Sequence, residues 1–315
     1  MFGKLRFIII IFSVFLLSGC QKYDDESNIF SKIYKQYDFV YNVTVNDDMM
    51  CFVGKNSKTK TVGYVKLSNT EPVYNLYSLD SNERIVDFDV SNENNIVMLK
   101  YTLDSDNIAN LTSLENKETY ELIHIDFNGN IKSSFNLANS ISMDDATGFC
   151  DLEIDLEGNI YIVDYNGDVW VLDEYGNYLF FIDNNDGEFI GLDRCTDGSV
   201  VVLTSENQYN YKIHVIDVDK KSYKSFSGYV ENMKNVYKFT KGMESGITYL
   251  KDNALYNYSF KDNKNYKFYS LAKKEKIDTV SAITLLNDGR YFVIDSHYDN
   301  DTNTVIYSSV YLIIQ

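Results

Sequence analysis

Apolar and polar residues alternate with a period of two over most of the chain beyond residue 28, and short polar turns interrupt the alternation. At residues 155–163 a turn containing Gly158 precedes a run of β-branched and aromatic residues, and residues 195–203 repeat this arrangement around Gly198. A period of two predicts half-buried strands, and glycine supplies the positive φ that a tight hairpin turn requires. The pattern therefore predicts a succession of β-hairpins and no amphipathic helix.

The hairpin pattern recurs as a degenerate repeat, and a second hairpin follows most copies. About four short strands in each unit of roughly 35–50 residues are typical of a β-propeller blade. The predicted fold is therefore an all-β propeller with six four-stranded blades. Five or seven blades remain alternatives, because two units are degenerate and Asp48 and Asn94 occupy turn positions where glycine is usual. The predicted units lie near residues 39–79, 85–137, 148–182, 190–226, 236–271 and 280–315.

Two segments do not fit a regular repeat. The second unit carries an insertion at residues 101–119, which is rich in Asp, Asn, Ser and Leu and predicts a surface loop. The sixth unit ends one strand short, and residues 29–37 are expected to supply its outer strand. Joining the two ends of the chain in one blade would close the ring and cover an open sheet edge.

The first residues of the chain have the pattern of an export signal. Lys4 and Arg6 precede an apolar run at residues 7–17, which ends in Leu17-Ser18-Gly19-Cys20. A run of this length with a basic start is a secretory segment and is short for a membrane span. The tetrapeptide resembles a bacterial lipobox, in which the cysteine becomes the lipidated first residue of the mature protein. An ordinary cleaved signal peptide and an uncleaved anchor are the alternatives.

This resemblance predicts the domain organisation and the location of the protein. The signal peptide covers residues 1–19, a lipidated tether covers residues 20–28, and the propeller covers residues 29–315. The lipid on Cys20 would hold the protein on a cell membrane or an outer membrane, facing the extracytoplasmic side.

Together with the lipobox, the recurring hairpin motif, as in Glu157-Gly158-Asn159-Ile160-Tyr161, resembles the six-bladed NHL-like β-propeller lipoproteins of bacteria. The resemblance covers most of the mature chain and implies the architecture. The motif is short and common to many propellers, so it implies little about function.

The charge of the chain limits its partners. The formal net charge is −17, and the export segment contains two basic residues and no acid, so the mature part is more negative still. A polyanion repels phosphate backbones and anionic headgroups, which argues against nucleic acid and against a membrane contact built on basic residues. Metal ions and cationic peptides or carbohydrates would be attracted, although acidic side chains also serve solubility alone.

Carboxylates recur on the strands that we expect to line the central channel. If several of them converge on the axis, they could bind a hard cation such as Ca²⁺, which prefers six to eight oxygen ligands. The alternative is that they face water in a polar channel. No other cofactor is indicated, and the identity of any metal stays unknown. The candidate axial residues are Asp87, Asp89, Asp151, Glu153, Asp193 and Arg194.

No catalytic motif accompanies these acids. GxSxG, HExxH and P-loop sequences are absent from the chain. His124 and His214 are expected on third strands, away from the axis, and His297 is expected in a turn. Cys51, Cys150 and Cys195 are isolated and odd in number, so we expect free thiols.

The sequence therefore favours a non-enzymatic, membrane-anchored module that binds a protein, peptide or carbohydrate ligand. Abundant tyrosine suits such surfaces, although it also suits half-buried strands. An assembly scaffold shares every feature of this hypothesis. The alternative is a metal-dependent, lactonase- or lyase-like propeller enzyme.

Overall fold

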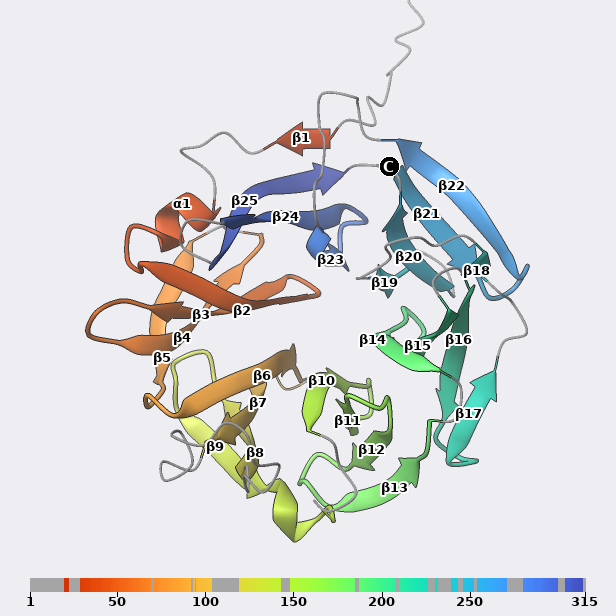
Figure 1. The fold of residues 1–315 in the computed structure, drawn as a ribbon, viewed down its shortest axis with the longest axis horizontal. Coiled ribbons are helices and arrows are strands. Elements are labelled where there is room, and N and C mark those ends of the chain that lie inside the picture. The colour runs from red at the N-terminus through yellow and green to blue at the C-terminus, as the bar shows by residue number, and fades with distance from the viewer. Residues whose placement is uncertain are drawn as a thin grey trace, which may run out of the picture.

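The computed structural model forms one ring of β-sheets (Figure 1). The predicted signal peptide, residues 1–19, and most of the predicted insertion, residues 104–118, lie outside the described residues. The described residues are 20–22, 29–68, 71–91, 93, 95–103, 119–142, 148–184, 187–207, 210–225, 230–231, 239–242, 246–251, 254–270, 280–299 and 304–313.

Six antiparallel sheets make up the ring, which confirms the predicted six-bladed, all-β propeller. Blade 1 consists of β2 (Phe39–Asn46), β3 (Met49–Lys55), β4 (Lys60–Lys66) and β5 (Pro72–Ser78). Blade 2 consists of β6 (Glu83–Val90), β7 (Ile96–Thr102), β8 (Thr119–Ile125) and β9 (Ile131–Asn136), followed by the 3-10 turn η2 (Leu137–Asn139). Blade 3 consists of β10 (Phe149–Ile154), β11 (Ile160–Asp164), β12 (Val169–Leu172) and β13 (Tyr178–Ile182).

The remaining blades follow the same order. Blade 4 consists of β14 (Glu188–Arg194), β15 (Val200–Asn207), β16 (Asn210–Asp217) and β17 (Ser222–Ser225), with β18 (Val230–Glu231) also pairing with β16. Blade 5 consists of β19 (Phe239–Lys241), β20 (Gly246–Lys251), β21 (Ala254–Ser259) and β22 (Lys264–Ser270). Blade 6 consists of β23 (Val280–Leu285), β24 (Tyr291–Asp299), β25 (Thr304–Ile313) and β1 (Cys20–Lys22).

The hairpin turns explain why the repeat folds locally. In the turn after β10, the carboxylate of Asp155 accepts hydrogen bonds from the main-chain amides of Glu157 and Asn159, and Gly158 has a φ of 90°. An aspartate that bonds its own turn two and four residues later fixes the reversal of the chain, and glycine takes the left-handed conformation at little cost. The same arrangement recurs at Asp126, Asp164 and Asp173.

The first strand of every blade runs in the same direction along the axis, so the ring has two different faces. We call the face where a turn joins the first and second strands of each blade the turn face, and the face where each first strand begins the start face. The turn after β2, which contains Asp47, and the turn after β23 therefore lie on the turn face. Cys20 pairs with Ile313, and Ile313 pairs with Tyr291, directly after the blade 6 turn. Cys20 thus lies at the turn-face end of blade 6.

Closure of the ring uses the N-terminal segment, as expected, but not the predicted part of it. β1 supplies the outer strand of blade 6 by pairing with β25, and the prediction that residues 29–37 form this strand is wrong. Residues 29–33 form the helix α1 (Ile29–Ile33) instead, with Ile29, Phe30 and Ile33 buried. These side chains pack between blades 6 and 1, in a cluster that includes Phe52 and Phe292.

Packing between neighbouring blades forms the rest of the core. Each blade twists, so its apolar face covers the next blade, and the buried clusters contain residues of adjacent blades. Trp170 of blade 3 is buried and packs against Phe149 and Phe181.

Other sequence predictions have mixed outcomes. His124 and His214 lie on the third strands β8 and β16, as predicted, whereas His297 lies within β24 and not in a turn. Cys51, Cys150 and Cys195 carry free thiols. Among the described residues, no helix has the length and hydrophobicity needed to cross a membrane.

Candidate functional site

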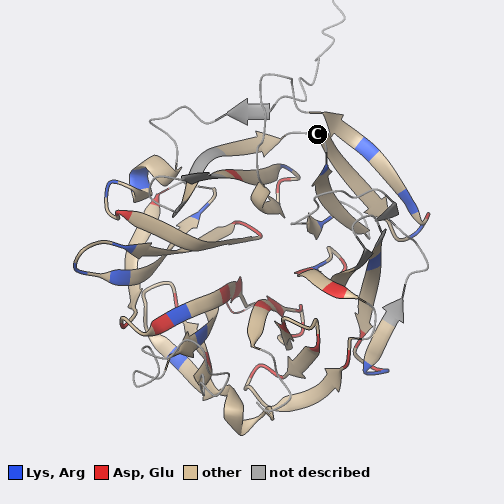
Figure 2. Cartoon of the chain, in the orientation of Figure 1, with Lys and Arg blue, Asp and Glu red and all other residues tan. Residues whose placement is uncertain are grey.

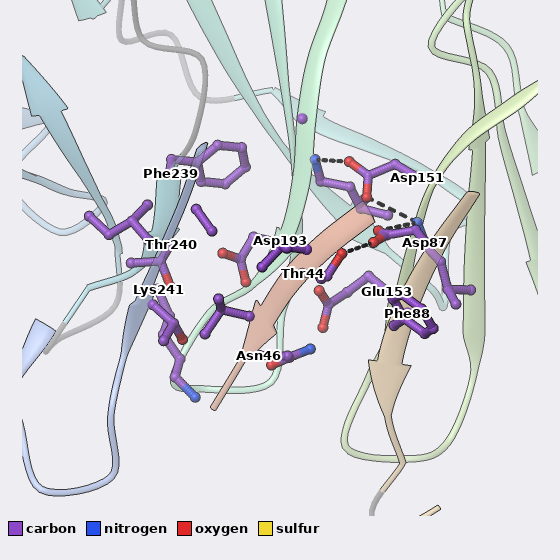
Figure 3. Close-up of a pocket in the computed structure, with 18 of the residues that line it drawn as sticks. Thr44, Asn46, Asp87, Phe88, Asp151, Glu153, Asp193, Phe239, Thr240 and Lys241 are labelled. Atoms are coloured by element: carbon purple, nitrogen blue, oxygen red, sulfur yellow. Dashed lines mark hydrogen bonds between the residues drawn. The ribbon is translucent and has the colours of Figure 1, made fainter. Parts of the chain in front are cut away.

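The first strands of neighbouring blades lie side by side around the axis of the ring and line a small cavity (Figures 1 and 3). Its volume is about 70 Å³, which suits a few water molecules or an ion and is far below the size of most small-molecule pockets. The lining side chains with charged or hydroxyl groups come from all six first strands: Thr44, Asp87, Asp151, Glu153, Asp193, Thr240, Lys241, Ser281 and Thr284.

Two of the axial carboxylates connect neighbouring blades. A first strand pairs on one side only, so its other edge leaves main-chain amides without a strand partner. The amide of Leu152 on β10 donates to Asp87 on β6 at 3.3 Å, and the amide of Leu192 on β14 donates to Asp151 on β10 at 3.2 Å. Thr44 on β2 donates its hydroxyl to Asp87 (Figure 3). These bonds connect blades 1 to 4 in sequence.

Asp89 makes a similar connection deeper in the protein. It is 1% exposed, and its carboxylate accepts hydrogen bonds from the side chain of Asn46 and from the main-chain amides of Val90 and Ile154. Burial raises the pKa of Asp89 to about 7, although Arg194 and the two amides act in the opposite direction. Asp89 therefore joins blades 2 and 3 as a carboxyl group that titrates near neutral pH.

Glu153 and Asp193 share this crowded environment. Glu153 is 4% exposed, and its Oε1 accepts no hydrogen bond. Burial raises the pKa of Glu153 well above its usual range, and the charges of Asp89 and Asp193 add to this effect, while Arg194 opposes it. Burial also raises the pKa of Asp193 to about 7, against the main-chain amide and charge of Arg194. The cluster therefore retains protons at neutral pH.

One basic residue crosses the channel at the turn face. Arg194 of blade 4 pairs with Asp47 of blade 1, with Nη2 and Oδ2 3.0 Å apart, and donates from Nη1 to the carbonyl oxygen of Ile154 at 2.8 Å. Its Nε lies 3.8 Å from Oε1 of Glu153. Lys241 of blade 5 pairs with the same Asp47 carboxylate. We call Asp47, Arg194 and Lys241 the turn bridge, because blades 1 and 4 lie on opposite sides of the ring.

The six predicted axial residues are thus brought together near the axis, but in two groups. Asp87, Asp151, Glu153 and Asp193 line the cavity, whereas Asp89 and Arg194 are buried beside it. Figure 2 shows acidic segments on β6, β10 and β14 around the centre.

Sequence reasoning missed the other two members of the turn bridge, Asp47 and Lys241. Asp47 adopts a φ of 47° in the first hairpin turn, so the left-handed position is Asp47 and not the neighbouring Asp48, where the sequence predicted it. Lys241 ends the first strand of the degenerate fifth unit, and aligning that unit by its inner strand would have placed it at the axis.

The axial carboxylates that the structure describes are not grouped as a metal site. Among the described residues, no three His, Cys, Asp or Glu side chains are placed to hold one metal ion. Asp87, Asp89 and Asp151 already accept hydrogen bonds from main-chain amides. A cation at these carboxylates would compete with the hydrogen bonds that connect the blades.

Comparison with known proteins supports the architecture. No family model and no curated protein sequence matches the chain. A luciferin-regenerating enzyme has a similar structure, with 11% identity and a TM-score of 0.53, covering 89% of this chain and 92% of that chain. A candidate gluconolactonase is also similar, with 9% identity and a TM-score of 0.54, covering 94% of this chain and 91% of that chain. At this identity the similarity shows the propeller fold alone.

Proposed function

We propose that the protein is a lipid-anchored extracytoplasmic β-propeller that binds a ligand and does not catalyse a reaction. The observation that carries this proposal is the position of Cys20 on one of the two faces of the ring. Cys20, the expected lipid attachment site, and the turn bridge both belong to the turn face. An acyl chain on Cys20 would hold the turn face toward the membrane and leave the start face free for a ligand.

The chemistry of the channel supports binding over catalysis. Its carboxylates hold neighbouring blades together through main-chain amides, and its volume of about 70 Å³ is too small for most organic substrates. The net charge of −17 would repel anionic headgroups, so a covalent lipid is the simplest means of membrane attachment.

Replacing Cys20 with serine is expected to abolish membrane attachment, because a hydroxyl group cannot receive the lipid. In a bacterial host grown with a labelled fatty acid, the native chain should carry the label and sediment with membranes. Cys20→Ser should lose the label and its membrane attachment. The matched control is Cys150→Ser, which replaces another, partly buried cysteine and should keep both properties. Retention of the label by Cys20→Ser would disprove lipidation at this residue.

The metal-dependent enzyme remains the competing hypothesis and predicts a bound cation. At about 5 mM Ca²⁺, a site with a Kd of about 1 mM would raise the free energy of unfolding by about 1 kcal/mol. For a domain of this size, that would raise the melting temperature by roughly 2 °C. Because Asp87, Asp89 and Asp151 already accept main-chain hydrogen bonds, we expect the melting temperature to stay the same with Ca²⁺ and with EDTA. A reproducible rise with Ca²⁺ that EDTA reverses would favour the enzyme.

A further inference from the structure

A cavity larger than the axial one lies away from the axis, on the start face of blade 1. Its volume is about 810 Å³, within the range typical of small-molecule pockets. It extends from the start of β2 and the β3–β4 turn to the beginning of blade 2, and Val305 of blade 6 closes one side. We call it the blade 1 groove, and it is lined by Phe39, Val40, Tyr41, Asn42, Lys55, Asn56, Ser57, Lys58, Thr59, Lys60, Leu79, Ser81, Arg84 and Val305.

The charge of the blade 1 groove is opposite in sign to the net charge of the chain. Four of its lining residues are basic, and none is acidic, although the chain has 46 acidic and only 29 basic residues. Figure 2 shows basic segments on the loops of blade 1, away from the acidic centre. The four cations are Lys55, Lys58, Lys60 and Arg84.

No carboxylate of the described part of the chain forms an ion pair with these cations. Lys60 and Arg84 both donate to the main-chain carbonyl oxygen of Glu83, and Arg84 also donates to that of Ser81 at 2.7 Å. The nearby carboxylate of Glu83 is occupied by Lys100 and by the amide of Asp80. Carbonyl oxygens orient the two cations but leave their charge without a counterion.

The cations also repel one another. Burial, together with the charges of Arg84 and Lys55, lowers the pKa of Lys60 to about 8, against the weaker effect of Glu83. A negatively charged group placed among them would relieve this repulsion and accept charge-assisted hydrogen bonds from them.

The β3–β4 turn, which contains Lys58, has a fixed conformation. At the tip of the β3–β4 turn, the side-chain oxygen of Asn56 accepts hydrogen bonds from the amides of Lys58 and Thr59, at 2.9 and 2.8 Å. A turn closed by its own asparagine is ordered before any ligand arrives, so less conformational entropy is lost on binding.

Apolar side chains form another part of the lining. Phe39 and Val305 are 44% and 45% exposed, which is unusual for large hydrophobic side chains in this ring, and they lie in the same groove as Leu79. Exposed apolar groups beside positioned polar groups are typical of a site that takes an organic ligand.

We propose that the blade 1 groove binds a small organic anion, whose carboxylate or phosphate group is held by Lys55, Lys58, Lys60 and Arg84 and whose apolar part contacts Phe39 and Val305. This inference deepens the proposed function, since it assigns the class of ligand to the start face. The groove lies on the face opposite Cys20, so headgroups of the anchoring membrane are not the occupant.

The test compares four probes that share a phenyl ring and differ in charge: phenyl phosphate, benzoate, benzyl alcohol and benzylamine. Binding to the full chain in a nonionic detergent is measured by ligand-observed NMR titration. For about eleven heavy atoms or fewer, a Kd of about 1 mM is expected for phenyl phosphate or benzoate. Benzyl alcohol should bind more weakly. General attraction to the acidic protein would instead favour benzylamine, so a preference for anions runs against the net charge.

The double variant Lys55→Gln/Lys58→Gln is expected to weaken binding of the anionic probes by about tenfold, because two charged contacts are lost. Both side chains are exposed, so the fold should tolerate the change. Lys261→Gln/Lys264→Gln is the matched control, because it removes the same charge at the exposed β21–β22 turn on the other face and should leave the affinity unchanged.

Three results would overturn the inference: no binding of either anion, equal weakening in both double variants, or tighter binding of benzylamine. Tighter binding of phenyl phosphate than of benzoate would identify the anionic group of the ligand as a phosphate. Tighter binding of benzoate would identify it as a carboxylate. None of these measurements involves a membrane. Failure of the groove is therefore distinguishable from failure of the anchor, which the Cys20→Ser experiment measures separately.

Discussion

Replacing Arg194 with methionine is expected to destabilise the protein by about 3–5 kcal/mol at pH 8, the usual cost of leaving buried charges without a partner. Arg194 is the cation shared by Asp47 and Glu153, and its charge also opposes the effect of burial on Asp89 and Asp193. Methionine preserves much of the apolar stem and removes the guanidinium group. Equilibrium unfolding in urea would measure the loss.

The destabilisation should depend on pH in a defined direction. The pKa values of Asp89 and Asp193 are raised to about 7 in the folded protein, above their values in the unfolded chain. The folded state therefore binds more protons between about pH 4 and pH 7, and the stability of the native protein decreases as the pH rises through 7. Without Arg194 these pKa values rise further. The variant should thus lose more stability at pH 8 than at pH 5.5, where protonated carboxyls need no cation.

Two further variants test this explanation. Adding Glu153→Gln to Arg194→Met should restore part of the lost stability at pH 8, because it removes the buried carboxyl whose Oε1 has no hydrogen-bond donor. Arg290→Met removes an arginine that pairs with Asp288 at the surface and should cost at most about 1 kcal/mol. An equal loss of stability at both pH values in Arg194→Met would contradict the electrostatic argument.

The sequence predicted the blades well because the signals for a hairpin are local. The carboxylate of Asp155 and the positive φ of Gly158 act within five residues, so their pattern is readable in the chain alone. The same holds for the alternation of buried and exposed positions along a strand. Six predicted units correspond to the six observed sheets, within a few residues at each boundary.

The roles of the axial residues were not predictable in the same way. Asp87 and Asp151 were expected near the axis and lie there, but their partners are main-chain amides of the next blade. Arg194 meets Asp47 only because the closed ring brings blades 1 and 4 to opposite sides of one narrow channel. Contacts that form only when the ring closes produce no regular spacing of residues in the sequence.

Net charge likewise concealed the local distribution of charge. A formal charge of −17 argued against nucleic acid and against a membrane contact built on basic residues, and it gave no sign that the blade 1 groove gathers Lys55, Lys58, Lys60 and Arg84. Lys55 and Lys60 flank one hairpin turn, whereas Arg84 begins the next blade. Only the packing of blade 2 against blade 1 brings them together.

The pattern of buried residues explains why the assignment of residues 29–37 to a strand was wrong. The buried residues Ile29, Phe30, Ile33 and Tyr37 lie at positions i, i+1, i+4 and i+8. This spacing is typical of one face of a helix and not of a strand. α1 is only five residues long, so its stability comes from burial and not from helix propensity. Tyr37 continues the contact beyond the helix and shares a hydrogen bond of 2.7 Å with the hydroxyl of Thr61.

Truncating Phe30 to alanine is therefore expected to destabilise the protein by about 3–5 kcal/mol, through lost burial and the cavity left behind. Phe30 is 1% exposed and packs in the cluster of Ile33, Phe52 and Phe292 that joins blades 6 and 1. Phe30→Leu preserves most of the volume and should cost only about 1 kcal/mol. Denaturant unfolding of both variants, monitored by circular dichroism, provides the comparison.

The same pair of variants distinguishes a helix that seals the ring from a peripheral segment. If α1 holds the junction of blades 6 and 1, Phe30→Ala should unfold as a single cooperative transition shifted to lower denaturant, because opening the junction breaks the closed ring. A peripheral segment would instead detach alone, with the main transition unchanged and Phe30→Ala as stable as Phe30→Leu. The full burial of Ile29, Phe30 and Ile33 favours the first outcome, since a detachable helix would not form part of the cluster between two blades.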